Sequence, residues 1–91
     1  MKKSVMMDIL ACPIDKHHPL ELHVVSEKGD GTVSEGALYC EKCSRFYPIM
    51  EEIPIMLPDD LRDKEQETEF LGRHSGSLPE KITARANPWH L

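Results

Sequence analysis

Two cysteines separated by two residues, Cys40 and Cys43, constrain the fold of this chain more than any other feature. A tight turn between them brings both thiols to one point, which is the geometry that a tetrahedral Zn2+ site requires. A second turn of this kind begins upstream at Cys12, where Asp15 takes the place of the missing fourth cysteine. The predicted metal site therefore consists of Cys12, Asp15, Cys40 and Cys43.

The identity of the fourth ligand stays open in the sequence. Asp15 offers a carboxylate oxygen, a poor match for a thiolate-rich structural site, whereas His17 or His18 offers an imidazole nitrogen, which is the better donor. The alternative without a metal is that these polar residues are exposed to solvent after a degenerate turn. A redox role for Cys40 and Cys43 is disfavoured, because the flanking residues have strand character and not the thioredoxin-like helix that such a site needs.

Length and charge narrow the function classes. The chain has 91 residues and a formal net charge of -5, and Lys and Arg never form a run longer than two. One small domain of this length has a marginal core, so a metal ion or a protein partner would stabilise it. The basic surface of a nucleic-acid-binding protein is absent, and the three cysteines do not suit a disulfide framework. We expect a cytoplasmic protein that does not contact nucleic acid directly.

The N-terminal residues superficially resemble a lipoprotein signal, because Lys2 and Lys3 precede an apolar run that leads to Cys12. Asp8 interrupts this run, which is also shorter than the roughly 7 to 15 apolar residues of a signal-peptide core. No stretch reaches the length of a transmembrane helix. We therefore expect neither lipidation nor contact with a membrane.

Hydrophobic periodicity predicts a small antiparallel sheet flanked by helices. A short helix is expected from Ser4 to Leu10, because Ser4 can cap it and apolar residues recur at helical spacing. Strands are expected from alternation and turn residues at 20–24, 32–39 and 46–50. The first two strands form a hairpin that carries the chain from one cysteine turn to the other, which is the layout of a zinc ribbon.

The composition changes after residue 58. Pro58-Asp59-Asp60 is a helix-start signal, and the residues that follow are dense in charge, so we expect a solvated helix there. From Arg73 onward the chain is polar and contains scattered Gly and Pro, which is typical of flexible segments. The predicted organisation is a zinc-ribbon-like domain over 1–58, a charged helix over 59–72 and a flexible tail over 73–91.

The segment from Phe46 to Leu57 contains more apolar side chains than one face of a small sheet can bury. Some of them should remain exposed beside a short edge strand, which suits the addition of a partner's strand to the sheet. The residues predicted to contact the partner are Phe46, Ile53 and Met56.

Several ordered blocks of the sequence carry a resemblance to a known family. They are Asp8-Ile9-Leu10-Ala11-Cys12-Pro13, Leu38-Tyr39-Cys40-Glu41-Lys42-Cys43, Tyr47-Pro48-Ile49 and Ile53-Pro54-Ile55-Met56-Leu57. Over about residues 1–61 the chain resembles the small activator subunit of tRNA, rRNA and release-factor methyltransferases. The resemblance implies a zinc-ribbon-like fold, and the residues themselves predict an α+β domain with a small zinc-ribbon-like antiparallel sheet, a short N-terminal helix and a charged C-terminal helix.

The resemblance also implies a function. It points to a non-catalytic subunit that binds and stabilises class I S-adenosylmethionine-dependent methyltransferases in translation, as a heterodimer that can self-associate when the partner is absent. Asp15 stands where the family has a cysteine, which puts Zn2+ binding in question. Met50-Glu51-Glu52 stands where the family's turn carries Asp-Gly, so this turn is expected to avoid positive φ, for instance as a type I turn.

No residues in the sequence form a nucleophile and base pair, a phosphate-binding glycine loop or a metal site with an open position, so we expect that the chain is not an enzyme. The alternative to a methyltransferase activator is a zinc-ribbon accessory protein that contacts nucleic acid in ribosome or transcription complexes. The acidic net charge argues against it. A third class is a redox or metal-carrier module, which a thiol titration with and without chelator would separate from the others.

Overall fold

The structure, a computed structural model, describes residues 10–18 and 20–91. At its centre lies a four-stranded antiparallel sheet with the strand order β1-β2-β3-β4. The strands are β1 (Glu21–Glu27), β2 (Val33–Tyr39), β3 (Phe46–Met50) and β4 (Ile53–Pro54). The three predicted strands correspond to β1, β2 and β3. The predicted helix from Ser4 to Leu10 lies outside the described residues, except for Leu10.

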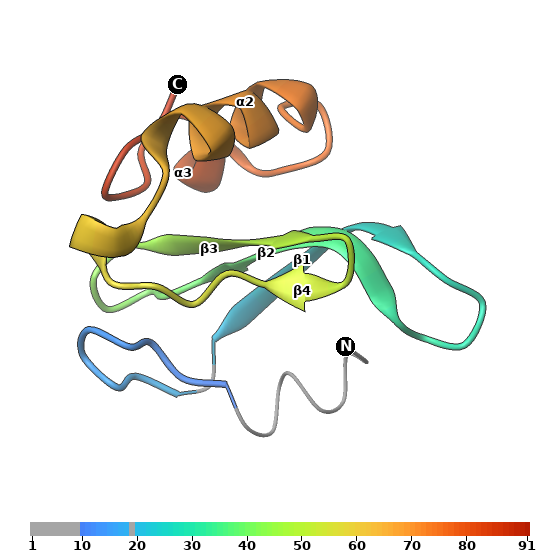
Figure 1. The fold of residues 1–91 in the computed structure, drawn as a ribbon, viewed down its shortest axis with the longest axis horizontal. Helices are drawn as coiled ribbons and strands as arrows, with labels where there is room; N and C mark the ends of the chain where they lie inside the picture. The colour runs from blue at the N-terminus through green and yellow to red at the C-terminus, as the bar shows by residue number, and fades with distance from the viewer. Residues whose placement is uncertain (1–9, 19) are drawn as a thin grey trace.

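The central strand β3 is buried on both faces of the sheet. Because side chains alternate along a strand, Tyr47 and Ile49 lie on one face, where they pack with the loop that carries Cys12. Phe46 and Met50 lie on the other face, beneath the C-terminal helices (Figure 1). The sheet therefore separates two small hydrophobic clusters, one next to the predicted metal ligands and one under the helices.

The C-terminal part of the chain forms a layer of helices over one face of the sheet (Figure 1). This layer consists of α2 (Lys64–Arg73) and α3 (Glu80–Thr83), and the 3-10 turn η1 (Asp59–Leu61) leads into it from the end of the sheet (Figure 1). The Asp63 side chain caps α2 by accepting a hydrogen bond from the Gln66 backbone N–H. No helix within the described ranges is both long and apolar enough to span a membrane.

Residues 73–91 pack on the sheet, which differs from the flexible tail that the sequence predicts. Leu78, Ile82 and Ala86 are buried there, in the same cluster as Phe70 of α2. The segment is poor in apolar residues, but these three are enough to anchor it, whereas Leu91 is exposed. The charged helix predicted over 59–72 also differs from the structure. The observed helix α2 begins only at Lys64, and part of its surface is buried instead of facing solvent.

A buried ion pair fastens this layer to the sheet. Nη2 of Arg62 lies 2.6 Å from Oε1 of Glu67, and the two side chains are 0% and 2% exposed. The Arg62 guanidinium also donates to the Phe46 carbonyl oxygen and lies over the rings of Phe46 and Trp89. Trp89 Nε1–H donates to the same Glu67 oxygen at 3.2 Å. One pair of charges thus joins β3, α2 and the last residues of the chain.

The turn between β3 and β4 has positive φ at both central residues, 50° at Glu51 and 70° at Glu52. The prediction that this turn avoids positive φ is therefore wrong. Met50 pairs with Ile53, which leaves a two-residue loop. Such loops favour type I′ turns, whose twist matches the twist of the strands, and this preference outweighs a penalty of about 1–2 kcal/mol for each non-glycine residue.

Replacing Glu52 with glycine is expected to raise the free energy of unfolding by about 1 kcal/mol, because glycine adopts this φ without steric strain. Glu52→Ala is the matched control, since it removes the same carboxylate and its ion pair with Lys28 but keeps the Cβ atom. Urea unfolding of the three proteins measures the difference. A glycine variant no more stable than the alanine variant would contradict a strained turn.

Candidate metal centre

Two turns with the same hydrogen-bond pattern present the predicted ligands. The Cys12 carbonyl oxygen accepts from the Lys16 N–H at 2.8 Å, and the Cys40 carbonyl oxygen accepts from the Ser44 N–H at 2.8 Å. In each turn the cysteine N–H also donates to the carbonyl oxygen five residues later. Lys16 and Ser44 have positive φ, at 62° and 60°. Asp15 thus takes in the first turn the position that a cysteine takes in the second.

The three cysteines converge as predicted, and Asp15, one of the candidates for the fourth ligand, lies with them. The ligand atoms of this cluster all lie within 4.8 Å of one another, and its members are Cys12, Asp15, Cys40 and Cys43. The two sulfur atoms of Cys12 and Cys43 lie 3.7 Å apart, and Cys40 Sγ lies 3.5 Å from Asp15 Oδ2. A tetrahedron with Zn–S bonds of about 2.3 Å has edges of about 3.8 Å. The 3.7 and 3.5 Å separations match such edges, and the widest separation exceeds them by about 1 Å, so small side-chain movements would bring all four atoms onto one tetrahedral ion.

The two histidines considered as alternative ligands do not belong to this cluster. His17 contributes its backbone instead, because its N–H donates to Asp15 Oδ1 at 3.0 Å and holds the carboxylate toward the thiols. His18 is exposed. Among the candidates that the sequence left open, the geometry favours Asp15 as the fourth ligand.

Hydrogen bonding and burial shift the pKa values of two of these groups in opposite directions. The hydrogen bond from the His17 N–H is the main cause that lowers the pKa of Asp15 to about 2, so this carboxylate is ionised at neutral pH. Burial is the main cause that raises the pKa of Cys40 to about 12. A thiol with such a pKa is a poor nucleophile, which argues against Cys40 as a redox-active thiol.

Two residues that the sequence did not connect with the metal lie against this cluster. Tyr47 is buried, and its hydroxyl group lies 3.0 Å from Cys12 Sγ. Asn87 hydrogen-bonds to the backbone of the second turn, and its Nδ2 donates to the Cys43 carbonyl oxygen at 3.1 Å. Contacts of this kind orient metal ligands. Strand alternation predicts that Tyr47 points inward, but nothing in the sequence pairs Asn87 with residues so far away.

The three residues predicted at a partner interface lie in different environments. Phe46 is fully buried, because β3 turns its ring toward Arg62 and the C-terminal helices. It belongs to the core and is not available to a partner in this structure. Ile53 is exposed, and Met56 is partly buried against the core. Of the predicted contact residues, Ile53 and Met56 reach the surface.

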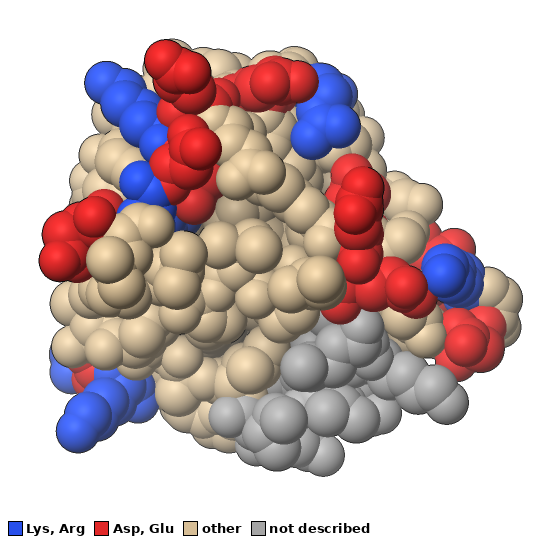
Figure 2. Space-filling view, viewed as in Figure 1, with Lys and Arg blue, Asp and Glu red and all other residues tan. Residues whose placement is uncertain are grey.

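Three exposed apolar side chains, Ile53, Leu57 and Leu61, lie along the segment that runs from β4 to η1, and this set is called the apolar patch below. Their exposed fractions are 61%, 37% and 64%. Figure 2 shows one face of the molecule, where an area without Lys, Arg, Asp or Glu crosses the middle and acidic side chains lie along its upper and right borders. Among the described residues β4 pairs only with β3, so its outer edge is unpaired there, and Ile53 of the apolar patch belongs to this strand. The chain therefore presents an edge strand and exposed apolar side chains together.

Comparison with protein families matches residues 3–52 to a family described as Trm112p-like protein. Two similar curated proteins are described as UPF0434 proteins. The one from Dechloromonas aromatica is 42% identical over 57 residues, which cover 63% of this chain and 81% of the relative. The one from Nitrosococcus oceani is 33% identical over 65 residues, which cover 71% of this chain and 93% of the relative.

A solved structure is also similar, with 44% sequence identity and a TM-score of 0.62. It is the complex between the Haloferax volcanii Trm112 methyltransferase activator and a candidate methyltransferase. The alignment covers all of the activator and 68% of this chain. The family match ends at residue 52, so η1, α2 and α3 lie beyond it.

Proposed function

This chain belongs to the Trm112p-like family, and from that premise we propose that it is a non-catalytic subunit that binds and stabilises a methyltransferase. The proposed partner is a class I S-adenosylmethionine-dependent enzyme that acts on tRNA, rRNA or a release factor in the cytoplasm. The active unit is a heterodimer, and the free chain self-associates through the surface that the partner would cover.

The observation that carries this proposal is the apolar patch beside the outer edge of β4, which has no paired strand within residues 10–18 and 20–91. Three exposed apolar side chains on one short segment offer apolar surface to a protein partner. An edge strand lets a partner extend the sheet through backbone hydrogen bonds, while alternate side chains supply specificity. The solved relative, an activator in complex with a candidate methyltransferase, supports the choice of partner.

We also propose that Zn2+ occupies the cluster of Cys12, Asp15, Cys40 and Cys43, where the ligand separations support a tetrahedral ion. When bound, the ion supplies a structural link between the two turns. A closed set of four protein ligands leaves no position for a substrate or a water nucleophile, which agrees with a non-catalytic role. In this way the ion would hold the loop of Cys12 against β2 and β3.

Replacing Ile53 with alanine is expected to weaken methyltransferase binding by at least about 2 kcal/mol while leaving the melting temperature almost unchanged, because Ile53 is exposed. Met56→Ala should act in the same direction. The tagged full chain is purified from its native cells, the bound methyltransferase is identified by mass spectrometry, and affinities are measured by calorimetry with purified partners.

The control for this experiment is Val24→Ala, which truncates an exposed apolar side chain on β1, away from the free edge of β4. Phe46→Ala should instead lower stability without a selective loss of binding, since Phe46 is buried. If the wild-type chain recovers no methyltransferase, the proposed function is rejected. If Ile53→Ala and Val24→Ala bind equally well, the interface is elsewhere.

A further inference from the structure

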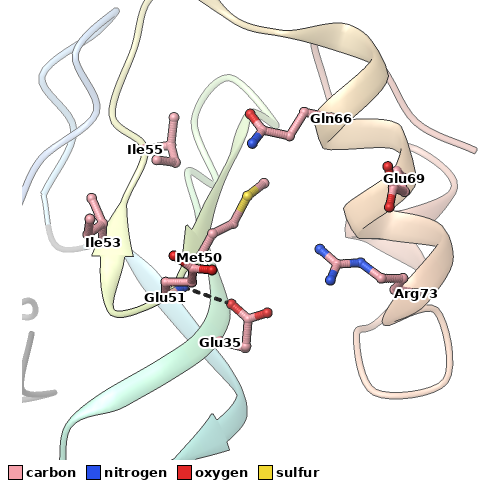
Figure 3. A pocket seen from close by; sticks show the side chains of 8 residues that line it. All are labelled: Glu35, Met50, Glu51, Ile53, Ile55, Gln66, Glu69 and Arg73. Carbon is pink, nitrogen blue, oxygen red and sulfur yellow. Dashed lines mark hydrogen bonds between the residues drawn. The ribbon is translucent and has the colours of Figure 1, made fainter.

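A hollow of about 420 Å3 lies between the β3–β4 hairpin and α2 (Figure 3). Its apolar side is formed by Met50, Ile53 and Ile55. Its polar side is formed by Glu35, Glu51, Gln66, Glu69 and Arg73. In Figure 3 the side chains of Met50, Gln66 and Arg73 extend into the space between the strands and the helix. Residues from the sheet and from the C-terminal layer therefore form this hollow together.

The charges that line the hollow are unbalanced. The lining contains three carboxylates, on Glu35, Glu51 and Glu69, and one guanidinium, on Arg73. Three negative charges and one positive charge give the lining a net charge of -2. One Glu35 oxygen accepts the Glu51 backbone N–H at 3.1 Å, and the other lies 3.7 Å from Nε2 of His74. These contacts hold the Glu35 carboxylate in place. An excess of carboxylates attracts a cationic ligand group.

The lining favours a polypeptide over a small molecule. Pockets for small molecules are lined mainly by apolar side chains, whereas five of these eight residues are charged or carry an amide. The hollow reaches the edge of β4 through Ile53 and Ile55, and within the described ranges β4 pairs only with β3. Pro54 has no N–H to offer at that edge, so side-chain contacts must supply more of the affinity for an added strand.

We propose that the hollow binds an extended segment of the partner protein in which lysine or arginine alternates with apolar residues. This inference rests on the proposed function, because it assigns the segment to the methyltransferase bound at β4. The apolar side chains of the segment contact Met50 and Ile53, and its cation lies between Glu35 and Glu69. Since α2 lies beyond the family match at residues 3–52, the wall that it forms gives this chain a selectivity of its own for a basic segment.

The test reverses one charge in the hollow and the same charge just outside it. Glu69→Lys is expected to weaken binding of the identified methyltransferase about tenfold or more, because like charges then face each other. Glu65→Lys, one turn earlier on α2 and not part of the lining, is expected to change the affinity less than about threefold. Affinities are measured by calorimetry at low and at high salt, and the difference between the variants should shrink at high salt.

A second measurement does not depend on the methyltransferase. The full chain is titrated with a synthetic peptide that alternates valine with lysine and with a matched peptide that alternates valine with glutamate, and methyl resonances are followed by NMR. The basic peptide should shift the signals of Met50, Ile53 and Ile55, the acidic peptide should not, and Glu69→Lys should abolish the shifts.

The outcomes separate the two proposals. If the wild type binds a methyltransferase but both lysine variants bind it equally well, the proposed function stands and the hollow is not the site of a basic segment. If no methyltransferase is recovered, the proposed function fails, and the peptide titration decides about the hollow. Equal shifts with both peptides, or none with the basic one, would overturn the inference.

Discussion

Replacing Arg62 with leucine is expected to lower the free energy of unfolding by about 3–5 kcal/mol, because it leaves the Glu67 carboxylate buried without its charge partner. A small domain has a total stability of about 5–15 kcal/mol, so this loss is a large part of it. The C-terminal layer should detach first, since Arg62 also contacts the Phe46 carbonyl and the Trp89 ring. Urea unfolding followed by the fluorescence of Trp89, the one tryptophan in the chain, measures both effects.

The double variant Arg62→Leu with Glu67→Leu tests the cause of this loss. It should recover most of the stability, because no buried charge then remains unpaired. Lys28→Ala is the second control. It breaks the exposed ion pair with Glu52 and should leave the unfolding midpoint nearly unchanged. An Arg62→Leu variant as stable as the wild type would show that Glu67 is not buried in the folded protein.

Removing one thiolate from the metal centre should cause the largest loss of metal affinity. Cys40→Ser is expected to weaken Zn2+ binding more than about 100-fold, since changing only a residue that supports a ligand already costs about 10- to 100-fold. Asp15→Cys should strengthen binding by completing a four-thiolate set. Competition with a chromophoric chelator measures the affinities.

Zn2+ binding should also become tighter as the pH rises. Burial raises the pKa of Cys40 to about 12, so this thiol holds a proton that the ion must displace.

His17→Ala and Asp15→Ala decide between the alternative fourth ligands. His17 contributes its backbone N–H, which the alanine variant keeps, so this change should leave the affinity almost unaltered. Asp15→Ala should weaken binding strongly. A larger effect at His17 than at Asp15 would assign the imidazole to the ion. Undiminished binding by Cys40→Ser would place the ion outside this cluster.

The sheet and the cluster of ligands could be predicted from the sequence because local patterns determine them. Alternating side chains in residues 20–24 and 32–39 define a hairpin, and a hairpin brings the turns at both its ends together. The convergence of Cys12 with Cys40 and Cys43 follows from that topology. The choice of Asp15 over the histidines did not follow, because it depends on a backbone hydrogen bond within the first turn.

The C-terminal layer could not be predicted, because it depends on contacts between residues far apart in the sequence. Arg62 and Glu67 belong to a stretch dense in charge, and only the fold shows that they pair in the interior. Phe46 illustrates the same limit. Its sequence neighbours place it among exposed apolar residues, but the helices that bury it begin only after residue 58. The prediction for the β3–β4 turn was wrong for another reason. The twist of the hairpin requires positive φ, and this requirement outweighed the preference of non-glycine residues for negative φ.

The cover of Phe46 and Met50 is synthesised later than the sheet itself. The residues that bury this face of β3, Phe70 to Ala86, all follow it in the chain. Any event that detaches the C-terminal layer, such as the loss of Arg62, therefore uncovers Phe46 and Met50 together. Apolar side chains of a sheet that are exposed in this way promote aggregation, so the C-terminal layer also protects the sheet from other chains.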